Sequence, residues 1–130
     1  MDRLLNNDID VNSLSAGVLA FVGDAVFALL VSEELAVINR PAGVIHSLSV
    51  KRVNAVAQAA AYKIIEPILT EKEIRIYKRG RNSYTNNTPK GASEGQYHSA
   101  TGLEALFGYL YLNSEIIRLR EIFNIISKEF

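Results

Sequence analysis

The stretch Val18–Leu30, VLAFVGDAVFALL, decides how the rest of the chain is interpreted. It is apolar at nearly every position, which is typical of a helix that is buried on all sides, yet Asp24 lies in its middle. Burying an ionised carboxylate is costly unless the carboxylate is paired, hydrogen-bonded or bound to a metal ion. The alternative is that Gly23 and Asp24 interrupt the helix and that Asp24 caps its second half, because aspartate is a favoured N-cap residue.

A second apolar stretch with a single acid, Ala100–Leu112, ATGLEALFGYLYL, lies far along the chain and carries Glu104. Two apolar helices with one carboxylate each suggest that Asp24 and Glu104 meet. Two carboxylates cannot both stay ionised in a dry site without a counter-charge. Mg²⁺ is the simplest counter-charge, because it takes one or two carboxylates and keeps several waters. The alternative is two separate, partly buried acids, each satisfied by an arginine or by the backbone.

Length and composition predict one domain over residues 1–130, with enough apolar residues, 48%, to form a core. The absence of cysteine excludes disulfides and thiolate metal sites and is compatible with a cytoplasmic protein. Asp24 and then Glu33 and Glu34 interrupt the longest apolar run, so we expect no membrane span. The acidic N-terminal residues lack the apolar core of a signal peptide. We therefore predict a cytoplasmic protein that has no membrane partner.

The net charge of zero conceals an uneven distribution of charge along the chain. Residues 1–39 hold one basic and six acidic side chains, residues 40–98 hold ten basic and four acidic, and residues 99–130 hold three basic and four acidic. Such a chain can present a basic surface beside an acidic pocket, which is what metal-dependent cleavage of a polyanion requires. An ordinary solvated surface would give the same charge counts.

Capping residues and prolines divide the chain into helices, and no stretch shows the alternation of a strand. We predict an all-α fold of about six or seven helices. Pro41 suits the first position of a helix, and Thr70 with Glu73 forms a capping box. The predicted elements are an arm over residues 1–12, a helix from Ser13 or Ser15 to about Val37, a short helix from Pro41 to about Ser47, a helix from Ser47 or Ser49 to Pro67, a helix from Thr70 to Gly80, a helix capped by Ser99 and a last helix capped by Ser114.

The one long loop is predicted over residues 80–97, which are rich in glycine, asparagine, serine and threonine and have no periodicity. A loop of this length within a compact domain is usually functional or disordered. Lys78, Arg79, Arg81 and Lys90 lie in or beside this loop, and lysine and arginine are the residue types that bind phosphates. For Lys78 and Arg79 the alternative is that they complement the helix C-terminus, and His46 is read as having no function.

Leu19–Phe27 resembles the signature helix of the ribonuclease III family, and Leu103–Gly108 resembles its second acidic helix. The two motifs, in this order on so short a chain, are similar to the Mini-ribonuclease III subfamily, which lacks a double-stranded-RNA-binding domain. The resemblance covers roughly residues 14–120. Further similarity lies in Lys78–Asn82, in Pro89 and Lys90, and in Tyr97–Glu104.

The resemblance implies a ribonuclease III endonuclease domain that acts as a homodimer on double-stranded RNA with Mg²⁺, for which Mn²⁺ can substitute. Asp24 and Glu104 match the two acidic residues, as catalytic and metal-binding groups. Hydrolysis would leave a 5′-phosphate and a 3′-hydroxyl, and the subfamily implies maturation of large-subunit (23S) ribosomal RNA precursor ends. Gly17, Ala20 and Thr101 stand where full-length ribonuclease III has further acids. Water and Thr101 would fill that space.

The basic residues expected to grip RNA lie in or beside the loop and on the preceding helical stretch: Arg79, Arg81, Asn82, Lys90, Lys51 and Arg52. A-form RNA is recognised mainly through its shape, phosphates and 2′-hydroxyls. The main alternative function is a non-catalytic RNA-binding or ribosome-associated protein of the same fold, which the presence of both acids disfavours. A second alternative is a helical interaction module, which would not be retained by duplex RNA at low salt.

Overall fold

The computed structural model describes residues 3–83 and 90–129, and within them it contains helices and no strand. This confirms the predicted all-α class and the lower of the two helix numbers. The middle of the predicted loop, residues 84–89, lies outside the described residues. The α-helices are α1 (Ala16–Ala36), α2 (Ala42–Val53), α3 (Ala55–Ile65), α4 (Glu71–Arg81), α5 (Glu94–Leu112) and α6 (Ile116–Ser127), with short 3₁₀ turns at Val11–Ser13 and Glu66–Ile68.

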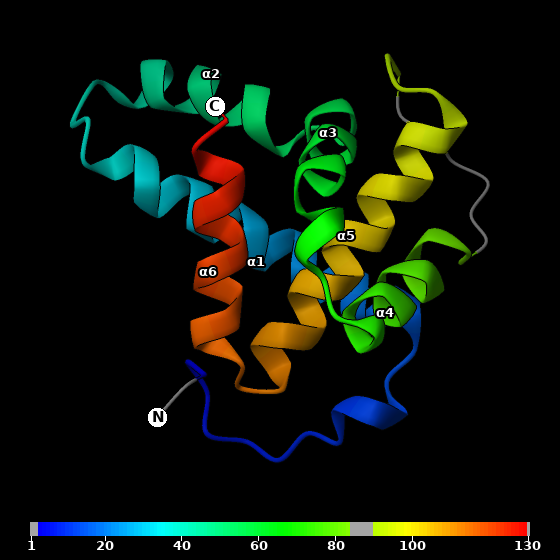
Figure 1. Ribbon diagram of the computed structural model, residues 1–130. Coiled ribbons are helices and arrows are strands. Elements are labelled where there is room, and N and C mark those ends of the chain that lie inside the picture. The colour runs from blue at the N-terminus through cyan, green and yellow to red at the C-terminus, as the bar shows by residue number, and fades with distance from the viewer. Residues whose placement is uncertain (1–2, 84–89, 130) are drawn as a thin grey trace.

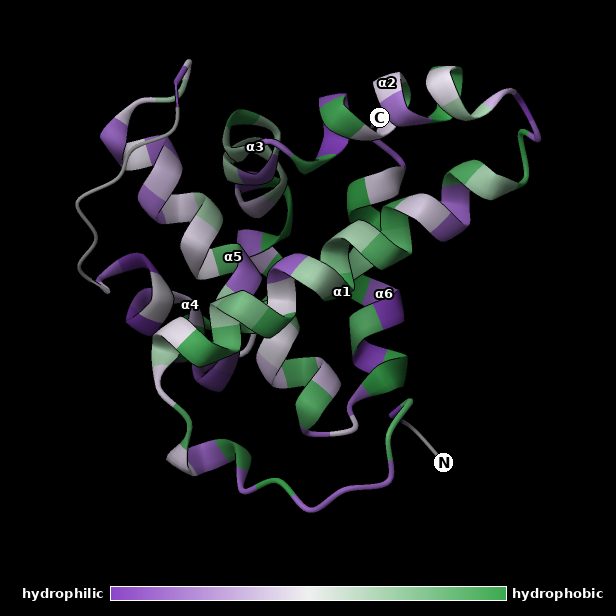
Figure 2. Cartoon of the chain, turned by 180° about the vertical axis from the view of Figure 1, so that it is seen from behind, coloured by the Kyte–Doolittle hydropathy of each residue, from purple (hydrophilic) through white to green (hydrophobic). Residues whose placement is uncertain are grey.

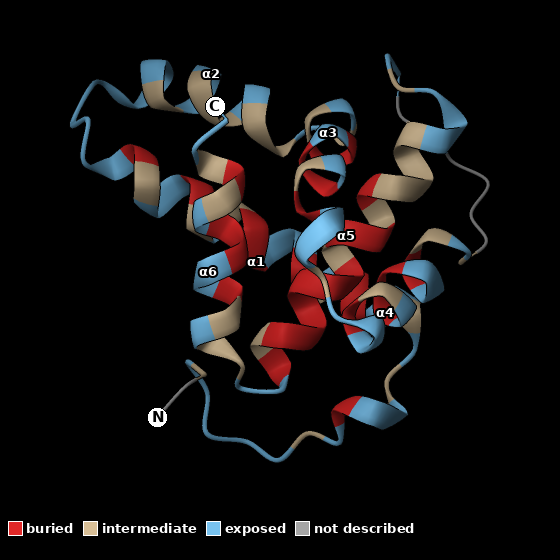
Figure 3. Cartoon of the chain, viewed as in Figure 1, coloured by how far each residue is buried: buried red, intermediate tan, exposed pale blue. Residues whose placement is uncertain are grey.

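Helix α5 is the centre of the molecule, and every other long helix except α2 packs against it (Figure 1). Its second half is buried along almost its whole circumference (Figure 3). The most extensive contact is with α1, followed by those with α4 and α3. Near the middle of α1, the ring of Phe27 lies 5.2 Å from that of Phe107 and 5.9 Å from that of Phe123, measured between ring centroids, and these contacts join α1 to α5 and α6.

Glycines allow α1 and α5 to approach closely where they cross. A Cβ atom on Gly23 would lie 1.6 Å from the carbonyl oxygen of Glu104, and one on Gly108 would lie 1.9 Å from the carbonyl oxygen of Leu19. No side chain larger than hydrogen fits at either position without separating the helices. Gly23 is therefore required for the close contact between α1 and α5. The alternative that Gly23 and Asp24 break the helix is wrong, because α1 continues through both.

Several helix starts follow the predicted caps. The Ser15 hydroxyl accepts a hydrogen bond from the Val18 amide at the start of α1. At the start of α4, both bonds of the capping box form, because the Thr70 hydroxyl accepts from the Glu73 amide and the Glu73 carboxylate accepts from the Thr70 amide. These positions were predictable because a cap depends only on neighbouring residues.

Other predicted boundaries are wrong. The break after α2 comes at Asn54, whose side chain caps α3, and not at Ser47 or Ser49. Helix α5 begins at Glu94 with Ser93 and Gln96 as a capping box, so Ser99 lies inside it and the predicted loop is shorter at its C-terminal end. Glu115, and not Ser114, is the N-cap of α6.

The outer face of α1 is uncovered, contrary to the expectation of a helix buried all round. Figure 2 shows α1 in front of the other helices, with hydrophobic residues along it. Phe21 is 80% exposed, and Val18 and Leu29 are also exposed. By length and composition α1 is apolar enough to cross a membrane, which corrects the expectation that its acids interrupt it. The core helix of a soluble protein passes the same test, and here α1 packs against α5.

Candidate active site

Asp24 on α1 and Glu104 on α5 meet where the two helices cross. The side chain of Asp24 lies within hydrogen-bonding reach of the Glu104 carboxyl group. Gly23, which precedes Asp24, contacts the backbone of Glu104 itself. The close crossing thus brings together two acids that are far apart in sequence. The alternative of two separate acids, each satisfied locally, is wrong.

The two acids differ in their exposure to solvent. Asp24 is exposed, so the expectation of a buried carboxylate at this position is wrong, whereas Glu104 is partly buried. Burial, reinforced by the adjacent Asp24 carboxylate, raises the pKa of Glu104 to about 8. Asp24 stays exposed although Gly23 beside it is buried against the backbone of Glu104. The pair is therefore open to solvent on the α1 side and enclosed on the α5 side.

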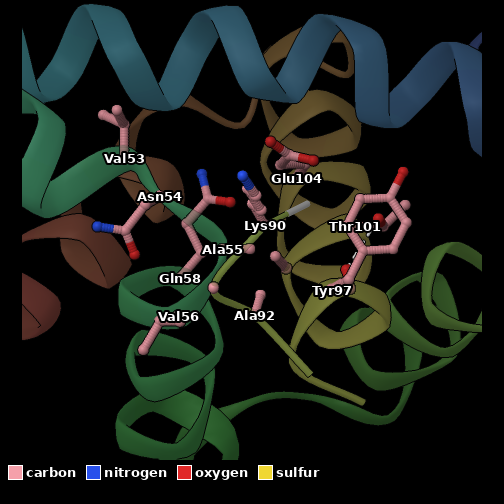
Figure 4. Close-up of a pocket in the computed structure, with 12 residues that line it drawn as sticks. Val53, Asn54, Ala55, Val56, Gln58, Lys90, Ala92, Tyr97, Thr101 and Glu104 are labelled. Atoms are coloured by element: carbon pink, nitrogen blue, oxygen red, sulfur yellow. Dashed lines mark hydrogen bonds between the residues drawn. The ribbon is translucent and has the colours of Figure 1, made fainter. Parts of the chain in front are cut away.

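A pocket of about 640 Å³ opens beside Glu104, between the start of α3 and the first half of α5 (Figure 4). Thr101 lines it, and the Thr101 hydroxyl donates to the carbonyl oxygen of Tyr97, 3.1 Å away. Lys90 also lines the pocket. The pocket therefore combines one acid, one cation and several apolar side chains.

Gln58 is the residue of this site that the sequence analysis missed. It lies on α3, lines the pocket and is only 2% exposed. Its amide faces Glu104 and acts to lower the pKa of the Glu104 carboxyl, opposing the effects of burial and of Asp24. The sequence offers only a weak signal for it, a single polar residue in the apolar run AVAQAAA of residues 55–61, because the burial that marks Gln58 is visible only in the structure.

The donor set of the acid pair fits a hard divalent cation. Mg²⁺ is held in many sites by one or two carboxylates and keeps several waters, and Asp24 and Glu104 supply two carboxylates with one side open to solvent. Among residues 3–83 and 90–129, no group of three or more histidine, cysteine, aspartate or glutamate residues is placed to hold a metal. A site built on four carboxylates is thus excluded for this part of the chain.

The residues expected to bind RNA divide into two groups. Arg81, Asn82 and Arg79 lie at the end of α4, where Arg81 Nε donates to Asn82 Oδ1 and the Arg79 guanidinium donates to the carbonyl oxygen of Leu14. Lys90 lines the pocket of Glu104. These placements do not test contact with RNA, which remains a prediction for each of them.

Lys51 and Arg52 occupy the last turn of α2. Lys51 is exposed. The Arg52 guanidinium forms an ion pair with Glu34 on α1, at 2.6 Å, and is mostly buried. This pair joins α2 to α1 and gives Arg52 a structural role that its position in a basic stretch did not reveal. We leave Arg52 out of the proposed RNA surface.

Comparison with known proteins shows the family to which the chain belongs. Residues 17–115 match the model of the ribonuclease III domain. A crystal structure of a protein from Fusobacterium nucleatum superposes with a TM-score of 0.84 and 30% sequence identity, covering 94% of this chain and 98% of that one. The chain therefore belongs to the ribonuclease III family, and it is an endoribonuclease.

Relatives with known names show which members of the family the chain is similar to. "Mini-ribonuclease 3" of Thermoanaerobacter sp. is 49% identical over 113 residues, covering 86% of this chain and 80% of the relative. "Mini-ribonuclease 3" of Clostridium tetani is 37% identical over 119 residues, covering 90% and 79%. The chain is thus similar over most of its length to Mini-ribonuclease 3 proteins, as the two acidic motifs suggested.

Proposed function

We propose that the chain hydrolyses double-stranded RNA at the Asp24–Glu104 pair with the help of Mg²⁺. The observation that carries this proposal is the convergence of these two carboxyl groups at the crossing of α1 and α5. Family membership supports the reaction class. The alternative of a non-catalytic RNA-binding protein of the same fold is disfavoured by the presence of both acids, since the loss of either would have favoured it.

Within this proposal, Asp24 and Glu104 hold the cation, directly or through its waters. When bound, Mg²⁺ would supply a water of lowered pKa and neutralise charge that develops on the phosphate. Glu104 must give up its proton to bind a cation, because its pKa is raised to about 8. Asp24, which is exposed, faces the side from which RNA can approach. The products would carry a 5′-phosphate and a 3′-hydroxyl.

We further propose that the active form is a homodimer. One Asp24–Glu104 pair can cut one strand, and a two-fold axis would place a second pair at the opposite strand. The exposed apolar face of α1, formed by Val18, Phe21 and Leu29, supports this proposal, since exposed apolar patches mark interaction sites. An apolar groove of about 700 Å³ between α1 and α6 continues this face.

Lys90, Arg79, Arg81, Asn82 and Lys51 are the residues that we propose to contact RNA. All except Arg81, which is partly buried, are exposed. Their cations would supply the salt-dependent part of the affinity. Maturation of large-subunit ribosomal RNA precursor ends in the cytoplasm is the biological role that we propose for this activity.

The proposed activity is tested with a long RNA duplex, with and without Mg²⁺, and with the Asp24→Asn protein as control. We expect Mg²⁺-dependent cleavage of the duplex, products with 5′-phosphate ends, and little cleavage of a single strand of the same sequence. The Asp24→Asn protein should bind the duplex and leave it intact. Binding without cleavage by the unaltered protein would instead support the non-catalytic alternative.

A further inference from the structure

The amide nitrogen of Gln58 is buried without a hydrogen-bond partner. The side chain is 2% exposed, and Nε2 has no acceptor among the residues that the structure describes. Buried polar groups are nearly always hydrogen-bonded, because an unpaired donor loses its interaction with water and gains nothing in return. Gln58 points into the pocket beside Glu104 (Figure 4). The Glu104 carboxyl group is the one acidic side chain beside this amide, but an amide NH2 group carries two hydrogens, so Gln58 can donate to an acceptor that enters this pocket.

The start of α3 forms one wall of the same pocket. Asn54, Ala55 and Val56 line it. The Asn54 side chain accepts a hydrogen bond from the backbone N–H of Ala57, and the Asn54 carbonyl oxygen accepts one from the backbone N–H of Gln58. The first N–H groups of a helix have no acceptor within the helix itself, and the positive end of the helix dipole attracts anions there. The wall that holds Gln58 thus favours a negatively charged ligand.

Lys90 brings a positive charge to the pocket. Figure 4 shows its ammonium group and the Gln58 amide turned toward the same space, with the Glu104 carboxyl group at the edge of that space. A pocket of about 640 Å³ accepts more than a single ion, and its remaining walls are largely small or apolar side chains. An anion carried on a larger organic group fits these features.

We propose that this pocket binds a backbone phosphate of the RNA, adjacent to the phosphate that is cleaved, and that Gln58 Nε2 and the Lys90 ammonium donate to its oxygens. The proposal rests on the proposed function, because it places RNA at the Asp24–Glu104 pair. It adds a specific phosphate subsite and assigns Gln58 a binding role. Gln58 completes its hydrogen bonding only when RNA is bound, which explains an unpaired donor in the free protein.

The experiment measures equilibrium binding of an RNA duplex in EDTA, where no cleavage is expected, for the wild-type and Gln58→Met proteins. Methionine keeps the approximate volume and removes the donor. Since hydrogen bonds to charged groups are among the stronger ones, we expect Gln58→Met to weaken binding about tenfold. Its melting temperature should be equal or higher, because an unpaired buried amide has been removed. Lys90→Gln should also weaken binding, and Lys63→Gln, which removes an exposed lysine of α3 outside the pocket, is its matched control.

A set of duplexes, each with one phosphate near the cut replaced by an uncharged methylphosphonate, locates the contact. One position beside the cut should weaken wild-type binding about as much as Gln58→Met does, and should have little further effect on the variant, since both changes remove the same hydrogen bond. The scan with the wild-type protein needs no substitution, so this part of the test remains valid even if the Gln58→Met protein folds poorly. If every position has the same small effect, the proposal is wrong.

Unchanged binding by Gln58→Met in EDTA, with slower cleavage in Mg²⁺, would also overturn the proposal, because the amide would then serve only Glu104. Failure of the proposed function looks different. In that case the Asp24→Asn protein would cleave as fast as the wild-type protein, whereas the effect of Gln58→Met on binding would be unaffected by that result.

Discussion

Glu104 shows how one residue depends on its surroundings. Its carboxyl group has an ordinary pKa of 4.5, which burial and then the neighbouring Asp24 raise to about 8. At neutral pH and without a cation, the pair therefore retains a proton. A divalent cation that binds the pair must displace this proton, so its binding should become tighter as the pH rises toward 8.

The stability of the cation-free protein should fall as the pH rises from 5 to 8. In this window the folded protein binds more protons at Glu104 than the unfolded chain does, so raising the pH favours the unfolded state. Urea unfolding at several pH values in EDTA measures this slope. The Glu104→Gln protein cannot titrate at this position, so its free energy of unfolding should lack the part of the pH dependence that comes from Glu104. The same slope in both proteins would contradict the raised pKa.

Gln58 illustrates what sequence cannot reveal at this scale. Asp24 and Glu104 could be predicted as a pair, because each is a single acid in an apolar helix. Gln58 gave no comparable signal. It matters because the packing of α3 against α5 places it beside Glu104, and the sequence does not reveal that contact. The exposure of Asp24 was also beyond prediction, since an apolar pattern does not distinguish a face that covers the core from a face that remains open.

At the scale of elements, the crossing of α1 and α5 determines the site. Replacing Gly23 by alanine would place a Cβ atom 1.6 Å from the Glu104 carbonyl oxygen, so the helices would have to separate. We expect a loss of at least about 3 kcal/mol of stability, similar to severe overpacking of a core. Thermal unfolding measures it.

Gly43→Ala provides the matched control for Gly23→Ala. Gly43 lies in α2, and a Cβ atom there would meet nothing within 4 Å. Alanine should therefore stabilise the helix by up to about 1 kcal/mol, because glycine is the poorer helix former. Equal effects of the two substitutions would show that the crossing is not as close as described.

The contact between α4 and α6 depends on an ion pair. The buried Glu73 carboxylate accepts hydrogen bonds from Arg118 Nε and from a terminal nitrogen of Arg118, both at 2.8 Å. Burial alone would raise the pKa of Glu73, but the bonds from Arg118 and Thr70 outweigh it and lower that pKa.

Glu73→Gln should destabilise the protein by about 2 kcal/mol, the order expected for hydrogen bonds between charged groups. Glutamine can still form the capping box, so the change isolates the ion pair. Because the pKa of Glu73 is lowered, the difference between the two proteins should shrink as the pH falls below 4.5, the ordinary pKa of the group. Urea unfolding checks this, and Glu71→Gln, at an exposed position in the same turn, should have little effect.

Element boundaries could be predicted where the signal is local and not where it depends on tertiary contacts. The Thr70 capping box was found because its parts are adjacent in sequence. The continuous helix through Gly23 was ambiguous, because glycine followed by aspartate suits both a helix cap and a close helix crossing. Only the position of α5 decides between them.

At the scale of the whole molecule, the proposed dimer accounts for the uncovered face of α1. Phe21→Glu would place a charge at the centre of that face, where the side chain is 80% exposed. Folding of the single chain should be little affected, while association of two copies should be lost. Sedimentation should show a wild-type dimer and a monomeric variant with reduced cleavage of duplex RNA. If the wild-type protein sediments as a monomer, the dimer proposal is wrong, whereas the proposal for the Asp24–Glu104 pair is unaffected.

The central claim is that Asp24 and Glu104 hold one divalent cation together. The most direct measurement is Mn²⁺ binding, followed by electron paramagnetic resonance, in the wild-type, Asp24→Asn, Glu104→Gln and doubly altered proteins. We predict one site per chain in the wild-type protein and an equal loss of binding in all three variants, because each acid is needed for the same ion. Undiminished Mn²⁺ binding by either single variant would contradict the claim.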